Sequence, residues 1–153
     1  MKTTLTILFF SFIVIQAQAR LGETEAQIVA RYGDALMMPY PVKQEESRQY
    51  CKLYKHDGLC MLVSFLDGKS QFESYHKADQ TPLAKGEVEI FLQNNTLGSK
   101  WVIKVDNASW ELESKAATAF YVAGNEQTLS ISTAAYNVYS TEKRVPKNKL
   151  KDF

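Results

Sequence analysis

Residues 59–75 read Leu-Cys-Met-Leu-Val-Ser-Phe-Leu-Asp-Gly-Lys-Ser-Gln-Phe-Glu-Ser-Tyr, and this stretch decides the predicted fold. Asp67-Gly68 stands between two runs rich in apolar and β-branched or aromatic residues, which is typical of a two-residue β-hairpin turn. This turn places Val63 opposite Phe72, so both side chains are expected on one face of an antiparallel sheet.

The strand before this hairpin, residues 50–54, joins it through the loop 56–58. A three-residue loop with Gly58 in the left-handed conformation sets Leu53 opposite Met61 and Cys51 opposite Val63. A two-residue loop would align Lys52 with Val63 instead. Because a slip of one residue moves every side chain to the other face, the apolar pattern favours the three-residue loop.

The predicted orientation of the two cysteine side chains follows from this register. An exported protein with an even number of cysteines invites a disulfide. In the predicted register, however, Cys51 and Cys60 point to opposite faces, whereas a disulfide needs Cβ atoms roughly 3.5–4.5 Å apart. The sequence therefore predicts two free thiols.

A capped helix precedes the first strands. Thr24 and Gln27 fit a capping box, Ile28 and Tyr32 belong to an apolar stripe, and Gly33 follows as the stop signal. Residues 34–49 contain two prolines and are expected to be irregular.

The second half repeats this order. Residues 81–83 open a helix whose apolar face holds Val88, Phe91 and Leu92, and strands follow at 101–105 and 108–112. A turn at Asp106-Asn107 pairs Ile103 with Trp110 and Trp101 with Leu112. A last hairpin, 116–133, turns at Gly124-Asn125 and sets Phe120 opposite Leu129, with Ile131 on the same face.

The predicted fold class is α+β, with two helix-plus-antiparallel-meander units of α-β-β-β type packed as one small domain. The domain covers residues 20–140, with units at 20–78 and 79–140, and a flexible basic tail at 141–153. The expected core shares the apolar sheet face and comprises Val63, Phe65, Phe72, Trp101, Ile103, Trp110, Phe120, Leu129 and Ile131.

Residues 1–19 have the order of a cleavable signal peptide. Lys2 precedes the apolar run 5–15, and Ala17-Gln18-Ala19 matches the small-x-small cleavage pattern, so the cut is expected between Ala19 and Arg20. The apolar run is shorter than the roughly 20 residues that span a bilayer. Arg20 stands where a lipoprotein needs cysteine, and no later apolar run is long enough to span. We therefore expect an exported protein, periplasmic or secreted, with no membrane span and no lipid anchor.

Two resemblances rest on short motifs. Thr24-x-x-Gln27-Ile28-x-x-x-Tyr32-Gly33, followed by Val63-x-Phe65-x-x-Gly68-Lys69, resembles the small lipoprotein of the bacterial outer-membrane barrel-assembly machine. The doubled helix-plus-sheet order is similar to that of the secreted β-lactamase inhibitor protein. The lipid-bearing cysteine is missing, and Ala35 stands where the lipoprotein pattern usually has proline. The resemblances imply an exported bacterial protein built of such units.

The sequence contains few signals of chemistry. Beyond residue 19, 17 basic residues balance 17 acidic ones, which argues against a nucleic-acid partner. His56 is expected in a turn and His76 at a strand end, both solvated. The usual metal, thiol-redox and hydrolase motifs are missing, so we expect no catalytic residue, metal site or cofactor.

Aromatic residues supply the one positive functional signal. In the predicted register Tyr54 and Tyr75 lie on the face opposite the apolar one, near Leu62, and tyrosines are favoured interface anchors. The alternative is that residues 34–49 or the other half of the sheet cover this face. We expect an exported non-enzymatic module that binds another exported or envelope protein. The alternatives are a small periplasmic enzyme without a recognisable motif and a structural accessory of the cell envelope.

Overall fold

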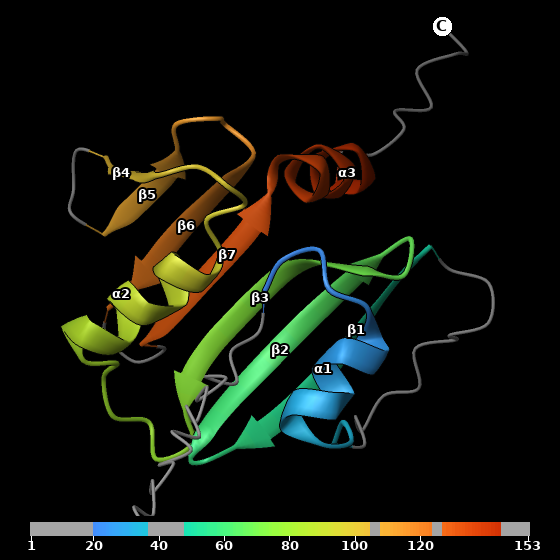
Figure 1. The fold of residues 1–153 in the computed structure, drawn as a ribbon, viewed down its shortest axis with the longest axis vertical. Helices are drawn as coiled ribbons and strands as arrows, with labels where there is room; N and C mark the ends of the chain where they lie inside the picture. Colours follow the sequence, from blue (N-terminus) through green and yellow to red (C-terminus); the bar gives the residue numbers. More distant parts are fainter. Residues whose placement is uncertain (1–19, 37–47, 105–107, 124–126, 145–153) are drawn as a thin grey trace, which may run out of the picture.

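The computed structural model describes residues 20–36, 48–104, 108–123 and 127–144. The predicted signal segment 1–19, the turn at Gly124-Asn125 and residues 145–153 of the predicted tail lie outside these ranges. The described chain is an α+β domain with three helices and a seven-stranded antiparallel sheet (Figure 1). None of its helices is long and apolar enough to cross a membrane.

Elements alternate along the chain as a helix, three strands, a second helix, four strands and a third helix. In order they are α1 (Glu25–Tyr32), β1 (Gln49–His56), β2 (Leu59–Leu66), β3 (Lys69–Lys77), α2 (Lys85–Asn94), β4 (Trp101–Ile103), β5 (Ser109–Leu112), β6 (Ala117–Val122), β7 (Thr128–Thr133) and α3 (Ala134–Arg144). The sheet order is β1-β2-β3-β7-β6-β5-β4, so the last strand returns to the middle and pairs with β3.

Helix α1 begins and ends as predicted. The Thr24 side chain accepts from the Gln27 N–H, and the Gln27 side chain accepts from the Thr24 N–H over 2.9 Å, which completes the capping box. Gly33 follows the helix with a φ of 82°, where a residue with a Cβ would be strained. Ile28 and Tyr32 are buried against the sheet.

The predicted register of the first hairpin is wrong by one residue. Asp57 and Gly58 form a two-residue turn with positive φ at both positions, and Lys52 lies opposite Val63. Lys52 tolerates this face because its ammonium group reaches Glu25 in the first turn of α1 and forms an ion pair there. The apolar stem of Lys52, with its charge paired at the tip, thus takes the position opposite Val63 that the predicted register assigned to Cys51.

The second hairpin turns at Asp67-Gly68 as predicted, but its pairing differs. A β-bulge between Ser64 and Phe65 shifts β3, so that Val63 lies opposite Glu73 rather than Phe72. Phe72 therefore moves to the open face, where it stacks on Tyr136 of α3 with ring centroids 5.4 Å apart.

These shifts correct the predicted positions of Tyr54 and Tyr75. Both lie on the face that α1 and α2 cover and are fully buried, and Tyr75 stacks on Phe91 of α2 at 4.3 Å. Leu62 alternates with them and lies half-buried on the other face.

In the second half one register is confirmed and one is wrong. Trp101 pairs with Leu112, and Ile103 with Trp110, as predicted. Phe120, however, pairs with Ser130, and Tyr121 takes the position opposite Leu129. Phe120 is consequently 53% exposed on the open face, and Ile103, at the sheet edge, is 57% exposed.

The core sits between the sheet and helices α1 and α2. Of the nine residues predicted there, Val63, Phe65, Leu129 and Ile131 are buried. Phe72, Trp101 and Trp110 are half-buried. The predictions for Ile103 and Phe120 are wrong, because β4 has no outer neighbour among the described strands and because β6 is shifted by one residue.

Helix α3 was not predicted. Thr133 accepts from the Tyr136 N–H over 3.1 Å and caps its start. Tyr136 and Asn137 then contact Ser64 and Thr118 on the open face. The helix continues to Arg144, beyond residue 140, where the loose tail was expected to begin.

Candidate functional site

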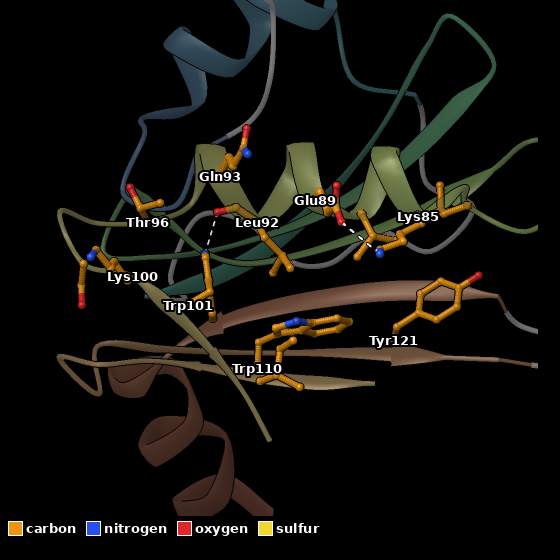
Figure 2. Close-up of a pocket in the computed structure, with 13 residues that line it drawn as sticks. Lys85, Glu89, Leu92, Gln93, Thr96, Lys100, Trp101, Trp110 and Tyr121 are labelled. Carbon is orange, nitrogen blue, oxygen red and sulfur yellow. Dashed lines mark hydrogen bonds and ion pairs between the residues drawn. The ribbon is translucent and has the colours of Figure 1, made fainter. Parts of the chain in front are cut away.

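An apolar groove lies between α2 and the strands β4, β5 and β6 (Figure 2). Its volume is about 850 Å³, which falls within the range of sites that take up small molecules or partner side chains. Its apolar lining comes from both walls and comprises Leu83, Val88, Leu92, Trp101, Ile103, Trp110 and Tyr121.

Helix α2 forms one wall of the groove because its apolar residues face both the core and the groove. Phe91 stacks on Tyr75 in the core, whereas Val88 and Leu92 also border the groove. The start of the helix is held at β3, since Glu87 accepts from the Ala84 N–H over 2.6 Å and pairs with Lys77 at 3.0 Å. This wall is therefore fixed to the sheet independently of the groove.

Trp101 fixes the opposite wall to the helix. Its indole N–H donates over 2.6 Å to the carbonyl of Leu92, which lies in the last turn of α2. Trp110, from β5, lies across the floor beneath Leu92 (Figure 2). Among the described residues, the Trp101 indole N–H has a hydrogen-bond acceptor and the Trp110 indole N–H has none.

Charged side chains stand at the two ends of the groove. Lys85 and Glu89 lie 3.8 Å apart at the end near Tyr121, and Lys100 lies at the other end beside Thr96 and Trp101 (Figure 2). The groove thus has an apolar interior and polar ends. This arrangement suits an apolar group whose flanking parts remain hydrated.

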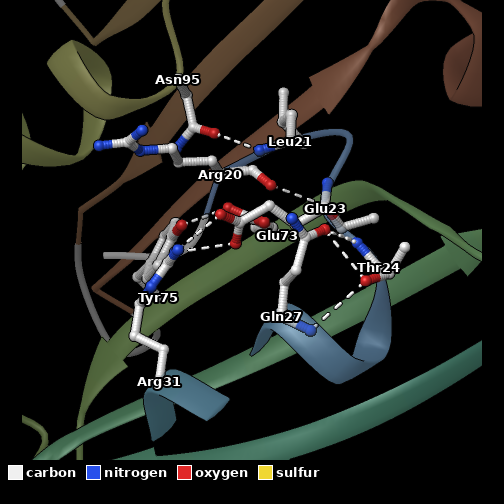
Figure 3. A network of polar contacts seen from close by, with 10 residues as sticks. Arg20, Leu21, Glu23, Thr24, Gln27, Arg31, Glu73, Tyr75 and Asn95 are labelled. Atoms are coloured by element: carbon white, nitrogen blue, oxygen red, sulfur yellow. Dashed lines mark hydrogen bonds and ion pairs between the residues drawn. The ribbon is translucent and has the colours of Figure 1, made fainter. Parts of the chain in front are cut away.

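A second, closed cluster lies between α1, β3 and α2 (Figure 3). Glu73 is fully buried and accepts from the Tyr75 hydroxyl, while its other oxygen has no partner among the described residues. Burial is the main cause that raises the pKa of Glu73 to about 7; the hydrogen bond from Tyr75 opposes this shift, and the nearby charge of Glu23 adds to it. Because Glu73 and Tyr75 are both inaccessible, the cluster acts on stability rather than on a bound group.

Contacts around Glu73 tie the N-terminal segment to the domain. Asn95, also buried, accepts from the Leu21 N–H over 2.6 Å, and Ser70 donates to the Arg20 carbonyl over 2.9 Å. Glu23 pairs with Arg31 of α1 through two bonds of 2.6 and 2.8 Å (Figure 3). The first described residues are therefore part of the packed structure.

The structure does not bring the predicted site residues together. Tyr54 and Tyr75 are in the core and Leu62 is on the open face. His56 is the exposed last residue of β1 and lies 3.3 Å from Asp57 in the turn that follows, and His76 lies half-buried on β3. Within the ranges that the structure describes, no group of three or more His, Cys, Asp or Glu side chains could hold a metal ion.

The sequence pattern assigned three groove residues, Trp101, Ile103 and Trp110, to the core, and gave Val88 and Leu92 as part of the apolar face of a helix. The prediction that Trp101 and Trp110 share one face of the sheet is confirmed. The sequence offered no signal that separates a groove from a core here, because the predicted strands at 101–105 and 108–112 are longer than β4 and β5.

Comparisons with protein-family models, with curated proteins and with solved structures find no match for this chain.

Proposed function

We propose that this protein is an exported, non-enzymatic binding module that takes an apolar side chain of a partner protein into the groove between α2 and β4–β6. One observation carries the proposal. The groove presents two half-buried tryptophans, Trp101 and Trp110, to an open apolar space. Tryptophan is among the residue types that are enriched in the anchors of protein–protein interfaces.

The ionisable lining supports binding rather than catalysis. It consists of Lys85, Glu89, Lys100 and Tyr121, and the carboxylate of Glu89 lies beside a lysine. A general acid or base needs a group whose pKa is tuned by an apolar environment. The one described carboxyl group with a strongly raised pKa is Glu73, which is enclosed in the core and does not line the groove.

The partner is an exported or envelope protein in this proposal. The signal pattern in residues 1–19 and the resemblance to two exported bacterial proteins support it. N-terminal sequencing of protein recovered from outside the cytoplasm should give Arg20 as the first residue. Recovery of an intact Met1 end from that compartment contradicts the proposed export.

A finer division of the fold into two units, residues 20–78 and 79–140, belongs to the same proposal. It is supported by the order of elements, since α1 precedes a three-stranded meander and α2 precedes a four-stranded one. The pairing of β3 with β7 then joins the two units into one sheet.

The groove is tested with a pair of matched surface variants. Ile103 and Phe120 are both large, apolar and more than half exposed, but Ile103 lines the groove and Phe120 lies on the opposite face of the sheet. The purified protein captures its partner from the host's envelope extract, and bound proteins are identified by mass spectrometry. Ile103→Asp should lose a partner that the wild type and Phe120→Asp retain. Loss with Phe120→Asp and retention with Ile103→Asp would place binding on the open face instead.

A further inference from the structure

Strand β4 is the edge of the sheet, and its register fixes which backbone groups face outward. The Lys104 N–H donates to the Ser109 carbonyl and the Glu113 N–H to the Lys100 carbonyl, each over 2.9 Å. In an antiparallel ladder these bonds flank the pairs Ile103–Trp110 and Trp101–Leu112, so neither pair exchanges backbone bonds with its partner. The N–H and C=O groups of Trp101 and Ile103 therefore point away from β5.

No other described strand pairs with this outer edge. At the opposite edge of the sheet, by contrast, the Leu36 N–H donates to the Leu53 carbonyl over 2.7 Å and occupies part of β1. Unpaired edges are templates for the addition of another strand. The outward groups of Trp101 and Ile103 are thus a two-residue template that no described strand occupies.

The same two residues line the groove. Trp101 and Ile103 direct their side chains to it, whereas Val102, 45% exposed, lies on the other face of the sheet. A strand that paired with the edge would place the residues opposite Trp101 and Ile103 on the groove side, because side chains alternate along a strand. Backbone pairing and groove filling would therefore come from the same segment.

We propose that an extended segment of a partner protein pairs with the edge of β4 as an added strand and inserts its alternate apolar side chains into the groove. This inference rests on the proposed function, since it states how the partner occupies the groove. Backbone bonds supply affinity in this mode of recognition, and the pockets for alternate side chains supply specificity.

The charges beside β4 determine which residues should flank the apolar part of the partner's segment. Lys100 and Lys104 stand immediately before and after β4. Glu111 is shared by Lys104 at 2.6 Å and Lys115 at 2.5 Å, and Glu113 lies opposite Lys100. Among the described residues around β4, three lysines thus stand beside two glutamates. The matching segment has acidic residues opposite Lys100 and Lys104 and three apolar residues between them.

A second copy of this chain fits the edge less well than such a partner. Symmetric antiparallel pairing of two β4 strands through their outward groups sets Trp101 opposite Ile103 of the other copy. Lys100 then lies directly opposite Lys104 twice, and like charges in directly opposed positions destabilise a strand pair. Lysines on an edge are a common device against self-association.

The test uses a peptide with Glu-Leu-Val-Leu-Glu at its centre, capped by serine and blocked ends, and a control in which both glutamates are lysines. Both tryptophans of the chain line the groove, so their fluorescence reports occupancy directly. We expect saturable binding of the acidic peptide and binding at least about tenfold weaker for the lysine peptide. Lys100→Glu should abolish this preference, because each peptide then meets one attractive and one repulsive charge beside β4.

The backbone contribution is isolated with two variants at one position. Ile103→Pro removes the outward N–H and leaves the hydrogen bonds to β5 in place. An edge strand tolerates proline at such a position, because the missing N–H would have pointed away from the sheet. Ile103→Ala removes a similar amount of side chain and keeps the N–H. We expect Ile103→Pro to bind the acidic peptide at least about tenfold more weakly than Ile103→Ala. Methylation of the two leucine amides in the peptide should weaken binding in the same way without changing the protein.

Equal binding by Ile103→Pro and Ile103→Ala, together with an unaffected methylated peptide, overturns strand addition. So does the absence of any binding by the acidic peptide. In both cases the capture experiment with Ile103→Asp and Phe120→Asp still decides whether the groove binds a partner. A dimer in sedimentation equilibrium that Ile103→Pro converts to monomer assigns the edge to a second copy and also overturns the proposal.

Discussion

The Trp101 indole donates a hydrogen bond of 2.6 Å to the carbonyl of Leu92, and this contact joins the edge strand β4 to the last turn of α2. The same carbonyl accepts from the Asn95 N–H over 3.0 Å. Because few other described polar contacts cross between α2 and β4, this bond keeps the two walls of the groove at a fixed separation.

Trp101→Phe removes this hydrogen bond while keeping an aromatic ring. We expect the free energy of unfolding to fall by about 0.5–1.5 kcal/mol, the usual net contribution of a hydrogen bond. Urea unfolding followed by circular dichroism measures it. Trp110→Phe is the matched control, since no described residue accepts from its indole N–H, and its cost should be smaller. A larger loss in Trp110→Phe would show that ring size, not the hydrogen bond, governs this wall.

Glu73 makes stability depend on pH. Burial raises its pKa in the folded protein to about 7, from an ordinary value of 4.5. The folded state therefore holds this proton more tightly than the unfolded state does. The stabilisation that comes from protonated Glu73 is fully present below about pH 4.5, declines as the pH rises, and is lost above about pH 7. We expect a decrease on the order of 3 kcal/mol in the free energy of unfolding across this window, on top of the effects of other groups.

Glu73→Gln isolates this effect. The amide cannot ionise and keeps an oxygen that can accept from the Tyr75 hydroxyl. Urea titrations between pH 4.5 and 8 should give a smaller decrease with rising pH for the variant than for the wild type, with the variant more stable at pH 8. Identical pH dependence in the two proteins would mean that Glu73 ionises in the fold without penalty.

Local signals in the sequence predicted local structure well. The capping box at Thr24 and the turn at Asp67-Gly68 are formed by neighbouring residues, and both are confirmed. The predicted strand registers are wrong where a contact between residues far apart in the sequence determines the pairing. Lys52 is accepted on the covered face because Glu25 of α1 pairs with it, and the sequence pattern of β1 contains no trace of that partner.

The β3 bulge explains the largest error in the site. The bulge places Glu73, rather than Phe72, on the covered face. Acidic residues are rarely fully buried, so an apolar pattern in the sequence does not predict one in the core. The neighbours that make Glu73 acceptable, Tyr75 and Asn95, come from the same strand and from the end of α2. The groove could be anticipated only as a cluster of tryptophans, because its open space depends on how α2 sits over the short strands β4 and β5.

Phe65 and Phe120 test which face is the core. Phe65 is fully buried and stacks on Tyr50 with ring centroids 4.8 Å apart, whereas Phe120 is more than half exposed on the opposite face. Phe65→Ala should lower the free energy of unfolding by about 3–5 kcal/mol, and Phe120→Ala by less than about 0.5 kcal/mol. Chemical denaturation of both variants measures the difference. Comparable losses in the two variants would contradict the shift of β6 by one residue.

The last prediction concerns Cys51 and Cys60, which are both free in the structure. The predicted free thiols are thus confirmed, but the predicted reason is wrong. Cys51 pairs with Ser64 and Cys60 with Lys55, so the two side chains lie on the same face of the sheet.

They are nevertheless four positions apart along β1 and β2, which corresponds to about 13 Å at 3.3 Å per residue. A disulfide joins Cα atoms that are usually less than about 7 Å apart, so the bond cannot form without dismantling the hairpin. Cys51 instead shares a contact of 3.0 Å with the Ser64 hydroxyl. Alkylation of the unreduced, unfolded protein followed by mass spectrometry should add two labels per chain. A linked Cys51–Cys60 peptide would require a different pairing of β1 with β2, and with it a different position for Lys52 and Tyr54.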